Sequence, residues 1–262
     1  MRRWFFACFL LGSICYSASV SAQDWRSGIP WEKPVVVTPG AAVSDAPSDA
    51  IILFDGKNMD AWSHQKWKVE DGAVTITGGG SVNTKQKFGS VQLHIEFMTP
   101  TPAKGKGQGR GNSGILFFGG KYEVQVLDSY EDETYFDGQC AAIYKQRPPL
   151  VNACKKPGEW QTYDIFFNKP KLKVEDGKVV EVERPARLTV VQNGVLVVNA
   201  FDLEGETAWH IPPTYTPIPD KGPIMLQDHG NPVKYRNIWV REIPDTNFKP
   251  ERTREPYYEG AK

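Results

Sequence analysis

Apolar and polar residues alternate with a period of two over much of the chain. Val91, Leu93, Ile95 and Phe97 are separated by polar or charged residues, which is typical of a strand with one buried face. The same pattern predicts further strands at residues 73–77, 113–118, 121–128, 161–167, 186–192, 195–200, 223–227 and 235–243. No amphipathic run long enough for a substantial helix occurs between residues 51 and 243.

Turn sequences separate many of these strands. Asp71-Gly72 and Asn193-Gly194 are strong hairpin signals. Nine or more short strands with frequent turns predict an all-β domain over residues 51–243, with two packed antiparallel sheets; a barrel is the alternative. If one sheet curves, every second side chain of its concave face would line a binding groove.

The two ends of the chain differ from this domain. Arg2 and Arg3 precede an apolar run and a stretch of small residues, so we expect a signal peptide over residues 1–22 and a secreted or periplasmic protein. The run is shorter than the roughly 20 apolar residues of a membrane span, so no membrane insertion is expected after its removal. Residues 23–50 are rich in Pro and Ala and predict a tether or peripheral wrap, and residues 244–262 predict a charged surface tail.

Charge and cysteine content narrow the function classes. Without Arg2 and Arg3, 29 basic residues face 31 acidic ones, a net charge of −2 that does not favour nucleic acid or an anionic membrane as a partner. Only Cys140 and Cys154 would remain in the exported chain. An isolated pair in an oxidising compartment predicts one disulfide, with two free buried thiols as the alternative.

A run at residues 121–128 carries the first candidate chemistry. Glu123 and Gln125 lie on one face of the predicted strand, and Asp128 would join them only if a bulge near Leu127 shifted the register. The spacing resembles that of retaining β-glucanases, which use two carboxylates about 5–5.5 Å apart. Here the middle position is an amide, so that mechanism does not transfer directly. The structural alternative is a solvent-facing Glu and a turn-forming Asp.

Two other regions add candidates. His229 follows Asp228 in a strand-end loop, where it could act as an acid or base, hold a metal, or belong to a simple turn. The long connection after residue 128 contains Tyr130 and Tyr144, which could bind sugar faces or pack the loop. The glycine-rich residues 104–111 lack the Lys-Ser/Thr of a phosphate loop and predict a flexible basic hairpin tip.

Five motifs together resemble the 3-keto-disaccharide hydrolase domain family over nearly all of residues 51–243. They lie at residues 53–62, 110–115, 122–130, 157–164 and 226–233. The resemblance implies a jelly-roll sandwich of the concanavalin A-like lectin/glucanase type. It also implies export in bacteria and action on glycosides whose sugar carries a ketone at C3.

The implied reaction needs a base, a group that stabilises an enolate, and an acid for the leaving group. The resemblance favours Glu123 or Asp128 as the base and His229 as the acid or polarising group. Gln125, Tyr144, Arg236 and Tyr130 are the candidates for binding the carbohydrate. No organic cofactor is implied, and a divalent cation between the carboxylates and His229 is left open.

Two other functions use the same fold. A non-catalytic carbohydrate-binding lectin would bind sugars in the same groove and leave them unchanged. Retaining β-glucan hydrolysis would need the carboxylate pair that Gln125 interrupts.

Overall fold

The computed structural model describes residues 25–26, 29, 33–64, 66–244, 255 and 257–258. The chain divides into two compact units, Val35–Asn247 and the two ends of the chain. In the second of these units a short pairing joins β1 (Trp25–Arg26) to β16 (Tyr257–Tyr258). The predicted signal peptide lies outside the described residues.

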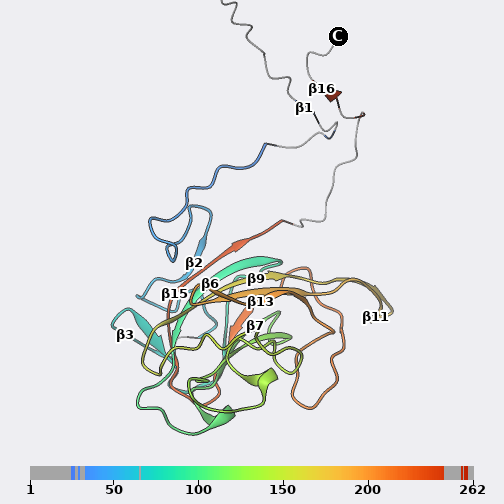
Figure 1. Cartoon of the computed structure of the whole chain (residues 1–262). Helices are drawn as coiled ribbons and strands as arrows, with labels where there is room; N and C mark the ends of the chain where they lie inside the picture. The colour runs from blue at the N-terminus through green and yellow to red at the C-terminus, as the bar shows by residue number, and fades with distance from the viewer. Residues whose placement is uncertain are drawn as a thin grey trace, which may run out of the picture. The chain divides into compact units, whose positions relative to one another are not determined.

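The larger unit contains an eight-stranded antiparallel sheet (Figure 1). Its strands follow the order β13-β12-β9-β6-β15-β4-β3, and β2 also pairs with β15. Their bounds are β2 Ile51–Phe54, β3 Lys68–Glu70, β4 Ala73–Thr75, β6 Val91–Met98, β9 Gln161–Asn168, β12 Arg187–Gln192, β13 Val195–Asp202 and β15 Lys234–Glu242.

A second, four-stranded sheet packs against the first and has the order β5-β14-β7-β8. Its strands are β5 Val82–Asn83, β7 Ser113–Phe117, β8 Tyr122–Val126 and β14 Ile224–Leu226. Two single-turn 3-10 helices, η1 (Gly107–Gly109) and η2 (Phe136–Gly138), lie in the connections. Within the described residues no α-helix occurs, and no helix is long and apolar enough to cross a membrane.

The hydrophobic core lies between the two sheets. Alternate residues of β6, β9 and β15 face alternate residues of β7, β8 and β14, and the Phe117 and Phe167 rings stack across the gap with centroids 4.4 Å apart. Each buried Leu, Ile or Phe side chain contributes about 1.5–3 kcal/mol of hydrophobic stabilisation. The prediction of an all-β, two-sheet antiparallel sandwich is confirmed.

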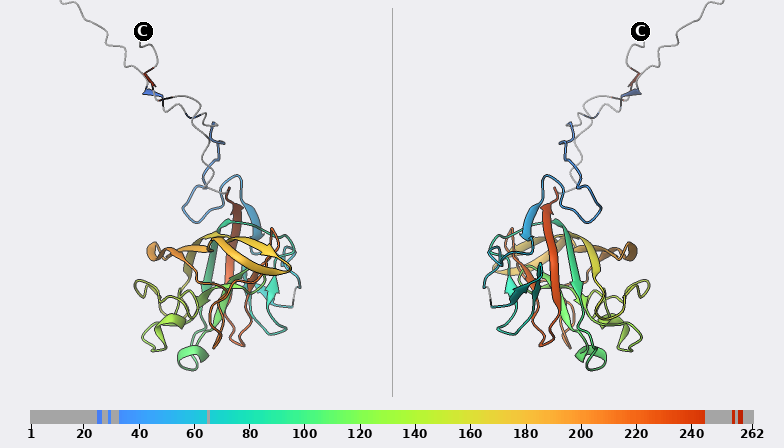
Figure 2. Two further views of the ribbon diagram at one scale, coloured as in Figure 1. Left: turned by 90° about the vertical axis from the view of Figure 1, so that its right-hand side faces the viewer. Right: turned by 90° about the vertical axis from the view of Figure 1, so that its left-hand side faces the viewer.

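The predicted hairpin turns are also confirmed. Asp71 and Asn193 have φ values of 52° and 52°, and the following glycines have φ values of 73° and 80°. Two consecutive residues with positive φ match the right-handed twist of the flanking strands. A further hairpin, β10 (Lys171–Glu175) with β11 (Lys178–Arg184), was not predicted. Figure 1 shows it projecting from the sandwich, and in the left view of Figure 2 it points toward the viewer.

The segment before β2 packs on the outer face of the large sheet. The Asn237 Nδ2 and Trp239 Nε1 groups both donate to the Ser44 carbonyl oxygen at 2.9 Å, and Arg241 forms a salt bridge with Asp49 at 2.6 Å. This part of the N-terminal segment is therefore a peripheral wrap, one of the two forms expected for residues 23–50.

The predicted disulfide between Cys140 and Cys154 stays a prediction. The structure describes both as free thiols, and the two side chains lie within hydrogen-bond reach of each other. Each sulfur also has further partners. The Cys140 Sγ atom lies 3.0 Å from the Tyr163 hydroxyl, and Cys154 Sγ accepts a hydrogen bond from Gln161 Nε2 at 3.5 Å. Tyr163 in turn donates to the Gln125 carbonyl oxygen at 2.8 Å, so this buried network supports β8.

Candidate active site

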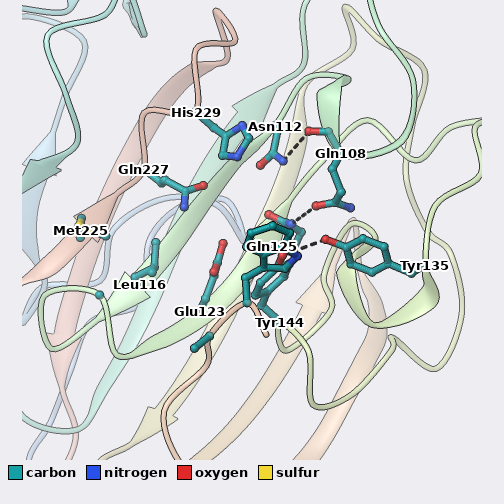
Figure 3. A pocket seen from close by; sticks show the side chains of 13 residues that line it. Gln108, Asn112, Leu116, Glu123, Gln125, Tyr135, Tyr144, Met225, Gln227 and His229 are labelled. Carbon is teal, nitrogen blue, oxygen red and sulfur yellow. Dashed lines mark hydrogen bonds between the residues drawn. The ribbon is translucent and has the colours of Figure 1, made fainter. Parts of the chain in front are cut away.

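A cavity of about 660 Å³ lies on the face of the small sheet that points away from the core. That volume is in the usual range for a small-molecule site, about 300–1,000 Å³. Figure 3 shows its side chains pointing into one space from separate segments. The lining residues are Gln108, Asn112, Leu116, Gly120, Glu123, Gln125, Tyr135, Tyr144, Ala208, Trp209, Met225, Gln227 and His229.

Strand alternation places the floor of the cavity. Val124 and Val126 of β8 are fully buried in the core, so the intervening Glu123 and Gln125 point to the opposite face, as predicted. Strand pairing sets two rows across the sheet. Met225, Leu116 and Glu123 form one row, and Gly114 lies opposite Gln125 in the next.

Glu123 is a buried acid without a partner. Its exposure is 7%, and no hydrogen bond or ion pair to its carboxyl group is formed by any residue that the structure describes. Burial raises the pKa of Glu123 to about 7. A Cβ atom at Gly114 would lie 2.5 Å from Glu123 Oε1, so the absence of a side chain there makes room for the carboxyl group.

The glycine-rich loop supplies two amides to the cavity. Gln108 lies in η1, and its Nε2 donates to Thr134 Oγ1 at 3.0 Å and to the Gly138 carbonyl oxygen at 2.8 Å. Its own Oε1 accepts from Gln125 Nε2 at 3.1 Å, and its carbonyl oxygen accepts from Asn112 Nδ2 at 2.7 Å. The loop predicted as a flexible basic tip is therefore fastened to the pocket wall.

These bonds leave acceptors unused. Asn112 Oδ1 and Gln125 Oε1 are buried and have no hydrogen-bond partner among the described residues. Buried polar atoms are normally paired. Two unpaired acceptors beside a cavity suit a ligand that carries hydroxyl groups.

A second loop holds the opposite wall. The Thr207 amide donates to the Lys121 carbonyl oxygen at 2.8 Å, and the Glu123 amide donates to Thr207 Oγ1 at 3.0 Å. Lys121 Nζ also forms an ion pair with Glu206 Oε1 at 2.5 Å. The loop that carries Ala208 and Trp209 is thereby fixed to the strand that carries Glu123.

His229 reaches the cavity from the loop after β14, and it is exposed. Its neighbour Asp228 accepts from the amides of Gly230 at 3.0 Å and Gly80 at 3.1 Å. Asp228 thus stabilises the turn rather than orienting the imidazole. The turn presents His229 to the cavity, and its role as an acid or base stays a prediction.

Tyr144 and Tyr135 line the cavity together. Their hydroxyl oxygens are 2.9 Å apart. Burial and the hydrogen bond to Tyr135 raise the pKa of Tyr144 well above its ordinary value, and the nearby Glu123 carboxylate contributes. Tyr144 therefore stays protonated and can donate a hydrogen bond.

Asp128 does not join this group. The β7–β8 ladder ends at Val126, before the position of the expected bulge, and Asp128 is not among the residues that line the cavity. Its side chain, 1% exposed, accepts from Arg110 Nε at 2.7 Å and from the Tyr130 amide at 3.2 Å. The predicted convergence of Asp128 with Glu123 and His229 is therefore wrong.

Two predicted binding residues also lie elsewhere. Tyr130 lines a separate surface depression with Arg110 and Lys156. Arg236 donates from Nε to Glu96 Oε2 at 2.6 Å on the large sheet and stacks over Trp160, with its guanidinium 4.1 Å from the ring centroid. Of the predicted residues, Glu123, Gln125, Tyr144 and His229 share the cavity.

The sequence left open a divalent cation between the carboxylates and His229. In the described part of the chain, no three His, Cys, Asp or Glu side chains come close enough together to hold a metal ion. Glu123 and His229 are the only members of that set of residue types among those lining the cavity.

Sequence reasoning missed Gln108, Asn112, Trp209 and Gln227. Most come from loops far apart in sequence, and no motif spacing links them. Gln227 could have been found, because it continues the outward alternation of β14 after Met225.

The chain is similar to a described protein family, to a bacterial relative and to solved structures. The sequence profile of the family described as "3-keto-alpha-glucoside-1,2-lyase-like domain" matches residues 49–241. A "3-keto-disaccharide hydrolase" of Bacteroides thetaiotaomicron is 26% identical over 304 aligned positions, covering 93% of this chain and all of the relative.

Solved structures agree with this family match. A protein of Parabacteroides distasonis assigned to the glycosyl hydrolases is 46% identical with a TM-score of 0.75, covering 81% of this chain and 94% of that one. A second protein of that organism with the same assignment is 23% identical with a TM-score of 0.56, over 74% and 99% of the two chains, and it supports the fold.

Proposed function

Because the chain belongs to the 3-keto-alpha-glucoside-1,2-lyase-like family, we propose that its cavity cleaves the glycosidic bond of 3-keto-glycosides, with Glu123 as the base. The single observation that carries the proposal is the buried, unpartnered carboxyl group of Glu123 beside unused amide acceptors. A general base works best when its pKa is near the working pH, and that of Glu123 is about 7.

The ketone explains why one base can suffice. A carbonyl at C3 acidifies the hydrogen at C2. Glu123 removes this proton, and the electron pair of the C2–H bond moves into an enolate on the C3 oxygen. The enolate then expels the C1 substituent as the C1–O bond breaks, and the leaving oxygen takes up a proton. The product is a C1–C2 unsaturated keto-sugar, and addition of water would convert it to the free 3-keto-sugar.

Cavity residues supply the remaining roles. The Gln227 side chain can donate to the ketone oxygen, where negative charge develops, as amides do in oxyanion sites. Asn112 Oδ1 and Gln125 Oε1 accept from sugar hydroxyls. His229 is the group assigned to protonate the leaving oxygen, and Tyr144 donates a hydrogen bond to the sugar.

Substrate oxidation state is the direct test. Purified chain is offered a phenyl 3-keto-glucoside and the matching unoxidised glucoside, and phenol release is measured by chromatography. Release from the keto form alone, with loss of the C2 hydrogen to solvent, is expected. Equal release from both would identify an ordinary glycosidase. Binding of both without release would support the lectin alternative.

Export is the second part of the proposal. The basic, apolar and small-residue order of residues 1–22 supports it. The full-length chain expressed in a Gram-negative bacterium should be recovered from the periplasm or medium with Gln23 as its first residue, as determined by N-terminal sequencing. Recovery from the cytoplasm with Met1 or Arg2 at the N-terminus would contradict it.

A further inference from the structure

Gln108 joins the two amide side chains whose acceptors are unused. Its backbone carbonyl oxygen accepts from Asn112 Nδ2 at 2.7 Å, and its side-chain Oε1 accepts from Gln125 Nε2 at 3.1 Å. Asn112 and Gln125 are each only 2% exposed, so neither amide is free to turn in solvent. Figure 3 shows both bonds on the Gln108 side of these amides, whose other ends point away from Gln108.

Two backbone carbonyl oxygens decide which way the three amides face. A carbonyl oxygen only accepts hydrogen bonds, so the amide atom beside it must be a nitrogen. The Gly138 carbonyl oxygen therefore fixes Gln108 Nε2, which donates to it at 2.8 Å, and this leaves Gln108 Oε1 to face Gln125. The Gln108 carbonyl oxygen fixes Asn112 in the same way. Any one of these amides, if flipped, would set two acceptors against each other.

The loop that carries Gln108 is itself held on both sides. The Gly107 amide donates to Asp132 Oδ2 at 2.6 Å, and Arg110 Nε donates to Asp128 Oδ2 at 2.7 Å. Gln108 is thus fixed before any ligand binds. A ligand that bonds to acceptors held in this way has little ordering entropy to overcome.

The result is a cavity wall that offers acceptors. Asn112 Oδ1 and Gln125 Oε1 have no partner among the described residues. A hydroxyl group donates to such an atom, whereas a ketone oxygen, an ether oxygen or a carboxylate only accepts. A keto-sugar therefore binds this wall through two hydroxyl groups. Its ketone must face a donor elsewhere in the cavity, which agrees with the role proposed for Gln227.

Resting on the proposed function, we infer that Gln108 is a positioning residue that makes the sugar subsite specific for a neutral ring with two free hydroxyl groups. Gln108 acts through Asn112 and Gln125, whose polarity it fixes. A site built to bond a hydroxyl group strongly rejects the analogue that lacks it, because a buried acceptor is then left unpaired. Sugars that are deoxygenated or O-methylated at either position are therefore poor ligands.

The first test measures binding and does not depend on turnover. Phenyl 3-keto-glucoside and its 2-deoxy, 4-deoxy and 6-deoxy analogues are titrated by calorimetry into the Glu123→Gln chain. Two of the three analogues should bind at least about tenfold more weakly than the parent compound. Equal affinities for all of them, as expected if a trapped water bridges the two acceptors, would overturn the inference, and so would the absence of any binding.

Gln108→Met, made in the same Glu123→Gln chain, tests the positioning role. The backbone carbonyl oxygen of residue 108 still holds Asn112, but Gln125 Nε2 loses its acceptor and the amide is free to turn. One of the two deoxy penalties should fall to about threefold or less, while the other is retained. Gln125→Met removes the acceptor itself and should abolish the same penalty. A uniform loss of affinity in Gln108→Met, or retention of both penalties, would contradict the positioning role.

Gln92→Met is the matched control for these variants. Gln92 Oε1 accepts from Arg241 Nη1 at 3.3 Å on the large sheet and does not line the cavity, so all affinities should stay as in the parent chain.

The proposed function and this inference can fail separately. If the wild-type chain cleaves none of the compounds but two deoxy analogues bind weakly, the proposed function fails and the inference stands. If the chain cleaves 3-keto-glycosides but binds the deoxy analogues as well as the parent compound, the inference fails and the proposed function stands.

Discussion

Two glutamates, Glu96 and Glu123, have the same exposure, 7%, on opposite faces of the sandwich, and they differ in their hydrogen-bond partners and in the direction of their pKa shifts. On the outer face of the large sheet, Glu96 accepts from Arg236 at 2.6 Å and from Asn237 at 3.0 Å, and these bonds hold its pKa below the ordinary value despite burial. On the small sheet, Glu123 has no such donors, and burial raises its pKa to about 7. At equal exposed surface the two pKa values therefore shift in opposite directions, because Glu123 lies deeper and has no partner among the described residues, whereas Glu96 has two donors.

The difference separates a structural carboxylate from a reactive one. Glu96 and Asp164 flank His94 beneath the stacked Trp239 ring, and this network ties the wrap and strands β6, β9 and β15 together. Glu123 instead faces a cavity. A base must be able to accept a proton from a ligand, which a carboxylate already bonded to a guanidinium does poorly.

Glu123→Gln should give the largest effect on activity. A positioned base contributes about 10²–10⁴-fold, so turnover of a 3-keto-glycoside should fall at least about 100-fold. Because the folded state raises the pKa of Glu123, ionisation costs stability as pH rises from about 4.5 through about 7. The variant should therefore be at least as stable as wild type at pH 8 in urea unfolding.

Glu181→Gln is the matched control for that variant, because Glu181 is exposed on the β11 hairpin. Its activity should equal that of wild type. A Glu123→Gln variant that retained more than a tenth of wild-type turnover would remove Glu123 from the mechanism.

Gly114→Ala should give the next largest effect. The new Cβ would lie 2.5 Å from Glu123 Oε1, so the carboxyl group must move. We expect about tenfold lower kcat/KM and a stability loss of about 1–3 kcal/mol from overpacking. Gly89→Ala, where a Cβ meets nothing closer than 3.9 Å, should change neither. Unchanged kinetics in Gly114→Ala would show that the position of the carboxyl group is not critical.

Asp128→Asn tests whether Asp128 is a structural carboxylate like Glu96 or a reactive one like Glu123. Its ion pair with Arg110 is buried, so weakening it should lower the unfolding free energy by about 2–4 kcal/mol. The folded Asp128→Asn variant should keep its kcat within about threefold of the wild-type value, because Asp128 does not line the cavity. A large fall in kcat with unchanged stability would place Asp128 with Glu123 instead of Glu96.

Glu96→Gln should affect stability alone, by about 1–3 kcal/mol at pH 7 through loss of charge-assisted hydrogen bonds. The pKa of Glu96 is lowered in the folded state, so its contribution is present above the unfolded-state pKa of about 4.5 and is lost as pH falls through the folded value. The difference between variant and wild type should therefore shrink in acid. A difference that stayed constant from pH 7 to pH 3 would argue against this pairing.

Period-two alternation was enough to predict the sandwich, because both sheets bury one face. It failed for β10 and β11, where Val174, Val180 and Val182 are all more than 40% exposed and no buried face imposes a pattern. In the site, alternation placed Glu123 and Gln125 correctly. Asp128 could join them only through an assumed bulge near Leu127, and the structure holds its side chain outside the cavity.

The remaining site residues depend on long-range contacts. Gln108 reaches the cavity through bonds to Thr134 and Gly138, and Trp209 through the attachment of its loop to β8. Arg236 was predicted to bind the sugar, but it forms a hydrogen bond with Glu96, its cross-strand neighbour. Both residues lie on the large sheet, whereas the cavity lies on the small one. Such pairings become visible only once strand order is known.

The pH dependence of kcat/KM for a 3-keto-glycoside tests most directly whether burial without a partner makes Glu123 the base. The profile is measured with C2-protonated and C2-deuterated substrate, so that proton transfer is known to limit the rate. If Glu123 is the base, the rate rises with pH as Glu123 loses its proton, with an apparent pKa near 7. An isotope-sensitive rate that is flat from pH 5 to pH 8, or that rises with a pKa near 4.5, would contradict it.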